Sequence, residues 1–213
     1  MPLYKTITVE PGINAYLWHV TESEDELSED LLLQPKSQLR IKGMKSELHR
    51  RAFISIRHLL CEAGYSDSDL YYDTTGKPHL QDGRFISITH SHQYTGIIVS
   101  SEKEVGIDIE KQREKILRIA HKFTPLQEYI TISNTEALIR KLTLVWGAKE
   151  SLYKIYATHG LSFLHHISIE DFEISDNKTR GEILYKGNKT NYEISFVEFD
   201  GFGCVYALKE ANN

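Results

Sequence analysis

Two long segments with helical spacing of apolar residues, 45–63 and 133–157, interrupt a chain that otherwise alternates between apolar and polar positions. The first is expected to end at Gly64, and the second is expected to begin at Ser133, which with Glu136 has the spacing of a capping box. Short strands are predicted over residues 3–9, 13–20, 85–90, 96–100, 104–110, 167–174, 181–186, 191–197 and 203–208. Because several of these strands follow one another directly, the pattern predicts an α+β protein with antiparallel sheets.

Three shorter segments also favour helix. Residues 23–33 are predicted as a helix that ends at Pro35, and residues 114–122 and 125–132 are predicted as two more. A polar turn is expected over residues 73–77. No linker stands out between these elements, so two halves, if the chain has them, are expected to pack closely.

Charge and composition exclude several classes of protein. The 213 residues allow one or two domains, and their formal net charge of −5 gives no basic signature for nucleic acid. No apolar run approaches the roughly 20 residues that span a bilayer, and the N-terminus does not resemble a signal peptide. Cys61 and Cys204 provide neither a disulfide framework nor a zinc spacing. We therefore expect a soluble, cytoplasmic protein with no membrane or nucleic-acid partner.

The net charge conceals a local asymmetry. Residues 21–30 contain six Asp and Glu and no Lys or Arg, whereas residues 31–60 contain seven Lys and Arg against the single acid Glu47. A solvated helix face would explain the basic segment. An anion-binding site is the more specific explanation, because clustered cations raise the local potential without changing the total.

The segment 104–110 carries the first group of candidate functional residues. Side chains alternate between the two faces of a strand, so Asp108 and Glu110 share one face beside the bare backbone of Gly106. Neighbouring carboxylates repel each other unless a cation lies between them, and Mg²⁺ is commonly held by one or two carboxylates. An ordinary amphipathic strand with a polar outer face would have the same pattern.

The long helix over 133–157 carries the second group. Trp146, Glu150 and Lys154 follow one another at intervals of four residues and so lie on one side of it. Glu150 and Lys154 either form a surface ion pair, or have separate roles in which Glu150 is a metal ligand or a base and Lys154 contacts a phosphate. Gly147 is costly inside a helix, and close approach of its backbone to a neighbouring element or to a ligand would account for it.

The strand over 85–90 runs into Thr89, His90, Ser91 and His92, a group rich in hydroxyls and imidazoles. Such side chains can hold phosphate or adenine by hydrogen bonds. Catalysis by a Ser–His pair is the alternative, although no G-x-S-x-G elbow is present. The two histidines could also bind zinc, but no third ligand lies at a spacing that is typical of zinc sites.

The order of these motifs is more specific than any one of them. Gly76-Lys77-Pro78, Ile88-Thr89-His90-Ser91, Gly106-Ile107-Asp108-Ile109-Glu110, the run Trp146 to Lys154, and Gly160-Leu161-Ser162 follow in that order. This series resembles the motifs of the 4'-phosphopantetheinyl transferases, and the length resembles the single-chain, surfactin-synthetase-activating type. The resemblance implies a pseudo-dimer of two similar α+β halves, residues 1–103 and 104–213, with the active site in the cleft between them.

The resemblance also implies a reaction and its partners. The phosphopantetheine arm of coenzyme A is transferred to a serine of an apo acyl carrier protein or a peptidyl or aryl carrier domain, and adenosine 3',5'-bisphosphate is released. The cofactor is Mg²⁺, with Mn²⁺ as a possible substitute, and the enzyme is expected to be a monomer. Two other functions remain open: a coenzyme A-binding module without catalysis, and a metal-dependent hydrolase of nucleotide pyrophosphates.

The resemblance assigns roles residue by residue. The metal ligands are Asp108, Glu110 and Glu150, and Lys154 contacts the pyrophosphate. The expected coenzyme A contacts are Lys77, Thr89, His90 and, for the 3'-phosphate, Arg50, Arg51 and Arg57. The general base is Glu150, Glu128 or a metal-bound hydroxide. Thr89 stands where many members carry serine, so the hydroxyl is retained.

Overall fold

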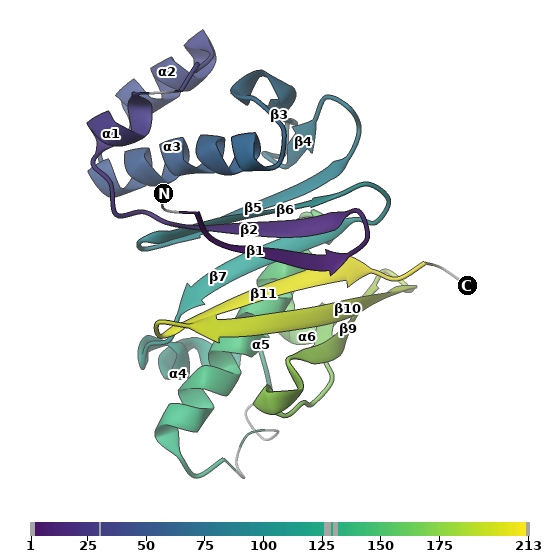
Figure 1. The fold of residues 1–213 in the computed structure, drawn as a ribbon. Coiled ribbons are helices and arrows are strands. Elements are labelled where there is room, and N and C mark those ends of the chain that lie inside the picture. Colours follow the sequence, from purple (N-terminus) through teal and green to yellow (C-terminus); the bar gives the residue numbers. More distant parts are fainter. Residues whose placement is uncertain (1–2, 30, 126–128, 130–131, 212–213) are drawn as a thin grey trace. The chain divides into compact units, whose positions relative to one another are not determined.

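A computed structural model describes residues 3–29, 31–125, 129 and 132–211, and it divides into two compact units (Figure 1). The first unit comprises Met1–Glu102 and the second Lys103–Asn213. Each unit contains an antiparallel sheet and at least one long helix. The predicted α+β class is therefore confirmed.

The N-terminal unit has a four-stranded antiparallel sheet in the order β1-β2-β6-β5. The strands are β1 (Leu3–Glu10), β2 (Ile13–His19), β5 (Phe85–Ser91) and β6 (Tyr94–Ser100). The long helix α3 (Glu47–Glu62) packs against β2 and β6. Its residues Ile56, Leu59 and Leu60 are buried against Trp18 and Ile97 of the sheet, so the helical spacing of apolar residues does face the core.

Two short helices replace the single helix that the sequence predicts over residues 23–33. Helix α1 (Glu24–Ser28) is capped by Ser23 and Glu26, and it ends well before residue 33. Helix α2 (Pro35–Gly43) then begins at the proline that was expected to stop a helix. The prediction is wrong here because proline fits the first helical position, where a backbone N–H has no partner to lose.

A small hairpin completes the N-terminal unit. Strands β3 (Leu70–Tyr72) and β4 (Pro78–Leu80) pair around the turn expected over residues 73–77, after a 3₁₀ helix, η1 (Asp67–Asp69). The sequence did not indicate strands of this length.

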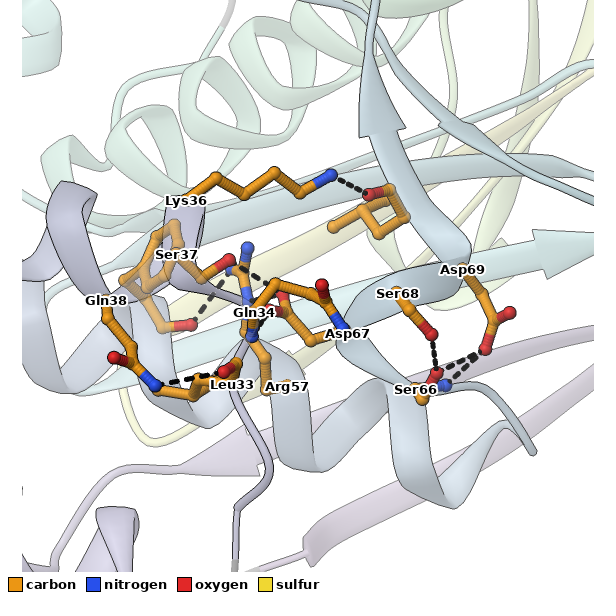
Figure 2. A network of polar contacts seen from close by, with 12 residues as sticks. Leu33, Gln34, Lys36, Ser37, Gln38, Arg57, Ser66, Asp67, Ser68 and Asp69 are labelled. Atoms are coloured by element: carbon orange, nitrogen blue, oxygen red, sulfur yellow. Dashed lines mark hydrogen bonds and ion pairs between the residues drawn. The ribbon is translucent and has the colours of Figure 1, made fainter.

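A buried ion pair ties η1 and α2 to α3 (Figure 2). Arg57 Nε of α3 donates to Asp67 Oδ1 at 2.9 Å, and the guanidinium lies over the Phe53 ring. Asp67 also accepts hydrogen bonds from Ser37 Oγ and the backbone N–H of Gln34, each at 2.9 Å. Burial acts to raise the pKa of Asp67, but these hydrogen bonds and the Arg57 charge outweigh it and hold the pKa below its usual range.

The C-terminal unit has a five-stranded sheet in the order β7-β11-β10-β9-β8, and all of its pairs are antiparallel. The strands are β7 (Val105–Lys111), β8 (Ile167–Ile169), β9 (Lys178–Tyr185), β10 (Asn188–Phe199) and β11 (Phe202–Lys209). The other elements are α4 (Lys115–Ile119), η2 (Ala120–Lys122), α5 (Thr135–Tyr156), α6 (Phe163–His166) and η4 (Ile174–Asp176). The long helix α5 packs against β7 and β11 (Figure 1).

Several predicted boundaries shift in this unit. Asn134, not Ser133, caps α5, and its side chain accepts a hydrogen bond from the backbone N–H of Ala137. Strand β8 stops at Ile169, earlier than residue 174. Most of the helix expected over residues 125–132 lies outside the described residues.

Two glycines allow α5 to pack closely on the sheet, one against backbone atoms and the other against a side chain. A Cβ atom on Gly106 of β7 would lie 2.1 Å from the carbonyl oxygen of Ser151, and one on Gly147 of α5 would lie 2.9 Å from Cγ2 of Val205. Ser151 Oγ also donates to the carbonyl of Val205 at 3.1 Å. Gly147 is therefore required by a neighbouring strand, which is one of the two explanations that the sequence left open.

Replacing Gly106 by alanine should destabilise the protein by about 3 kcal/mol or more, because the two atoms nearest to the new methyl group are backbone atoms of Ser151, which cannot rotate away. Urea unfolding monitored by circular dichroism would measure this. Gly43→Ala is the matched control, because a Cβ there meets no atom within 4 Å, and we expect a change within about 1 kcal/mol. Equal stability of the two variants would contradict the close approach.

Asp67→Asn should lower the free energy of unfolding by about 3 kcal/mol near pH 6, because it leaves the buried Arg57 without its counter-charge. A folded-state pKa below the unfolded value of about 4 contributes stability above that value, and the contribution is lost as pH falls through the folded pKa. The difference in the free energy of unfolding between wild type and variant should therefore be constant from pH 5 to 7 and become smaller towards pH 3. Asp82→Asn is the control, because the Asp82 side chain is exposed. If the difference for Asp67→Asn stayed the same down to pH 3, the link between the lowered pKa of Asp67 and the stability of the protein would be wrong.

Candidate functional site

Asp108 and Lys154 form an ion pair where α5 crosses β7. Asp108 is 6% exposed, and its Oδ1 accepts a hydrogen bond from Lys154 Nζ at 2.8 Å. The same ammonium donates to the carbonyl oxygen of Ile107 at 2.7 Å. The lysine can reach this strand because the helix backbone lies so close to it at Gly106.

Glu110 lies two residues further along the same face of β7. Its Oε1 accepts a hydrogen bond from Trp146 Nε1 of α5 at 3.2 Å. Burial, and then the nearby charge of Asp108, raise the pKa of Glu110 above its usual range. The sequence placed Trp146 on the same side of the helix as Glu150, but it gave no sign that the indole binds Glu110.

Glu150 occupies α5 one turn after Trp146 and one turn before Lys154. Burial is the main cause that raises the pKa of Glu150, to about 7. The negative charges of Asp108 and Glu110 also raise this pKa, whereas the positive charge of Lys154 acts to lower it. The structure therefore brings together the four residues that the two motifs singled out, as a group of three mutually repelling carboxylates and one ammonium.

The chemistry of this group fits a divalent cation. Hard carboxylate oxygens are the ligands that Mg²⁺ prefers, and the repulsion between them is what a bound cation would relieve. Mg²⁺ usually takes only one or two carboxylates and fills its other positions with water and phosphate oxygens. As they are placed in the described part of the chain, however, no three or more His, Cys, Asp or Glu side chains form a group that could hold a metal ion.

An apolar pocket of about 530 Å³ adjoins Glu150. Its lining residues are Ile119, Lys122, Phe123, Trp146, Glu150, Tyr153, Leu161 and Phe163. The Trp146 ring lies 5.0 Å from that of Phe123 and 5.4 Å from that of Phe163, centroid to centroid. Sequence reasoning missed this pocket, although Trp146, Glu150 and Tyr153 follow helical spacing, because its remaining walls come from other segments.

Lys149 is a second feature that the sequence did not reveal. It is 2% exposed, and its Nζ donates to the carbonyl oxygens of Phe163 at 2.8 Å and Ile167 at 2.6 Å. These bonds hold α6 and the start of β8 against α5, and with them the Phe163 wall of the pocket. A lysine beside Glu150 in a sequence gives no indication that it points inward.

The basic residues of the N-terminal unit differ in what they bind. Arg50 Nε donates to Glu24 Oε2 at 2.7 Å, and Arg51 Nη2 donates to the carbonyl of Val20 at 3.3 Å. The acidic segment 21–30 thus neutralises part of the basic segment, which weakens the interpretation of an open anion site. Arg57 is buried on Asp67, as described above, and its visible role is structural.

The other expected coenzyme contacts also lie in the N-terminal unit. His90 of β5 is exposed, and its ring lies 5.9 Å from that of His49, at the start of α3 beside Arg50. Thr89 is buried at 4% exposure, opposite Gly96 of β6. Lys77 ends the β3–β4 turn, where its backbone N–H donates to Asp73 Oδ1 at 3.0 Å. Glu128 lies outside the described residues.

Lys149→Met should lower the free energy of unfolding by about 1–3 kcal/mol, because it removes the donor from two inward-facing carbonyl groups. It should also alter the fluorescence of Trp146, which packs on Phe163. Lys115→Met on the exposed face of α4 is the control and should change stability by less than about 0.5 kcal/mol. If the two variants were equally stable, the anchoring role of Lys149 would be wrong.

The described part of the chain has no helix that is both long and apolar enough to cross a membrane.

Comparisons with known proteins identify the family of this chain. The family model of the 4'-phosphopantetheinyl transferase superfamily matches residues 104–210, which include β7 and α5. The chain is 31% identical over 135 residues to the 4'-phosphopantetheinyl transferase gsp of Aneurinibacillus migulanus, covering 61% of this chain and 53% of that protein. It is 33% identical over 138 residues to enterobactin synthase component D of Salmonella typhimurium, covering 60% and 56%. The chain thus spans about half the length of these curated relatives, and it belongs to the 4'-phosphopantetheinyl transferase superfamily.

Proposed function

We propose that this protein transfers the 4'-phosphopantetheine arm of coenzyme A to a serine hydroxyl of an apo carrier protein and releases adenosine 3',5'-bisphosphate. The observation that carries the proposal is the group of Asp108, Glu110, Glu150 and Lys154 within the segment that matches the family. Three coupled carboxylates with one ammonium suit a reaction at a pyrophosphate, where negative charge must be neutralised as it moves.

In this reaction the serine oxygen attacks the phosphorus atom attached to pantetheine. A new phosphoester bond forms, the bond from that phosphorus to the bridging pyrophosphate oxygen breaks, and the serine proton goes to a base. Glu150 is our candidate for the base, since its carboxylate lies at the edge of a pocket that could exclude water. Glu128 is the alternative among the residues of this chain.

Lys154 and the carboxylates have separate tasks in this proposal. The Lys154 ammonium would contact the pyrophosphate, and Asp108, Glu110 and Glu150 would hold Mg²⁺ or Mn²⁺. When bound, that cation would stabilise negative charge on the departing phosphate. The pocket bounded by Trp146 would accommodate the pantetheine arm, whose methyl and methylene groups match its apolar walls.

The N-terminal unit would contribute contacts to the nucleotide end of coenzyme A. Arg50, Arg51 and His90 are the candidates for the 3'-phosphate, with Lys77 and Thr89 as further contacts. Arg57 is the weakest of the expected contacts, because its guanidinium is already bound to Asp67 in the interior. The proposal retains the pseudo-dimer with a shared cleft, a monomeric state and a cytoplasmic location.

The function can be tested by incubating the protein with coenzyme A, Mg²⁺ and several apo carrier proteins and weighing each carrier by mass spectrometry. A gain equal to one phosphopantetheine on a serine is expected. No gain on any carrier would refute the transferase. Breakdown of coenzyme A without a carrier would instead favour the hydrolase, and binding without either reaction would favour the binding module.

Glu150→Gln should reduce the rate of transfer about 100-fold or more while the protein stays folded, because the amide cannot accept the serine proton. Glu136→Gln is the matched control, since Glu136 lies in the exposed first turn of the same helix and should retain wild-type turnover. Unchanged turnover in Glu150→Gln would show that the site is misassigned.

A further inference from the structure

The Lys154 ammonium lies against Oδ1 of Asp108, one of the two oxygens through which that carboxylate could bind a metal ion. Its Nζ is 2.8 Å from Asp108 Oδ1 and 2.7 Å from the carbonyl oxygen of Ile107. We propose that Lys154 is a resident counter-ion of Asp108, which must leave that carboxylate before a divalent cation binds tightly, and that a phosphate ligand draws it away. The inference rests on the proposed function only for the identity of the phosphate ligand.

The burial of Asp108 explains why the protein needs such a counter-ion. The Asp108 side chain is 9% exposed, and a carboxylate so far from water is costly unless a cation is paired with it. Glu110 and Glu150 interact electrostatically with Asp108 and, when ionised, add to the negative charge beside it. An enzyme without bound ligand would therefore be poorly stable if Lys154 were absent.

The anchoring of Lys154 explains why its ammonium can move although its backbone cannot. Ser151 and Ile155 of α5 are packed on Gly106 of β7, which fixes the helix against the strand. The Lys154 side chain is 27% exposed, so the end of its four-carbon stem can turn towards solvent. The lysine can thus exchange one anionic partner for another without any change in the fold.

Electrostatics then couples the metal to the phosphate. A divalent cation placed on Asp108 repels the ammonium beside it, so the metal alone should bind weakly. A pyrophosphate offers the ammonium a new anionic partner and releases Asp108 to the metal. By linkage each ligand must strengthen the binding of the other by the same factor.

The first test measures Mn²⁺ binding without any other ligand, by electron paramagnetic resonance of free Mn²⁺. Lys154→Gln and Lys154→Met should each bind Mn²⁺ at least tenfold more tightly than wild type, whereas Lys154→Arg should bind it as weakly as wild type. Lys189→Met is the matched control, because it removes an ion-paired lysine of β10, bound to Glu182, and should leave Mn²⁺ affinity unchanged. Equal or weaker Mn²⁺ binding by the neutral Lys154 variants overturns the proposal, as does the absence of any detectable Mn²⁺ binding in wild type and variants.

The second test begins with the wild type, so its first result does not depend on a variant that folds. Calorimetric titration of the wild type with coenzyme A, with and without Mn²⁺, should show at least a tenfold gain in affinity when Mn²⁺ is present. In Lys154→Gln the gain should fall below threefold. Independent binding of the two ligands to wild type overturns the proposal.

The outcome for Lys154 is separable from the outcome for the reaction. If no carrier gains mass but Mn²⁺ binds the neutral variants more tightly, the transferase fails and the counter-ion role stands. If carriers gain mass and the variants bind Mn²⁺ like wild type, the transferase stands and the counter-ion role fails.

Discussion

The contact of α5 with β7 through bare backbone at Gly106 is the constraint on which the rest of the C-terminal unit depends. It brings the carbonyl of Ser151 against a strand residue that has no side chain, and Gly147 leaves room on the helix for the Val205 side chain of β11. At an ordinary helix–sheet distance, an ammonium on the helix would be less able to reach Asp108 and the carbonyl of Ile107 together. The ion pair, the coupled carboxylates and the pocket wall at Trp146 all follow from this spacing.

The same spacing has an electrostatic cost that shapes the site. Glu150 and Glu110 are partly removed from water beside a buried aspartate, so their pKa values rise. One ammonium partly compensates for three carboxylates, which leaves the group suited to a further cation. A folded protein tolerates such a group because apolar packing elsewhere in the unit, around Leu152 and Ile194, supplies the stability.

Local patterns in the sequence predicted much of this arrangement. The alternation around Asp108 identified β7 and its polar face, and the four-residue interval from Glu150 to Lys154 identified one side of α5. Both are properties of neighbours along the chain. The α+β class followed from the same patterns, because direct succession of strands leaves few other ways to pair them.

What could not be predicted depends on residues distant in sequence. The inward direction of Lys149 depends on carbonyl groups 14 and 18 residues later, and the burial of Arg57 depends on Asp67 beyond the end of its helix. The basic segment 31–60 suggested an exposed anion site because sequence shows charge but not its partners. In the structure Glu24 and Asp67 bind two of its arginines. Pro35 was misread for a related reason, since proline marks the first turn of a helix as readily as its end.

The contact between α5 and β7 is made by main-chain atoms, and this has an evolutionary consequence. The distance between α5 and β7 is set by a carbonyl group and a glycine, and backbone atoms do not change when neighbouring residues are substituted. The pocket beside Glu150, by contrast, is bounded by side chains such as Phe123, Tyr153 and Phe163. Substitutions can therefore reshape the pocket, and with it the choice of ligand, while the spacing of the charged groups is inherited unchanged.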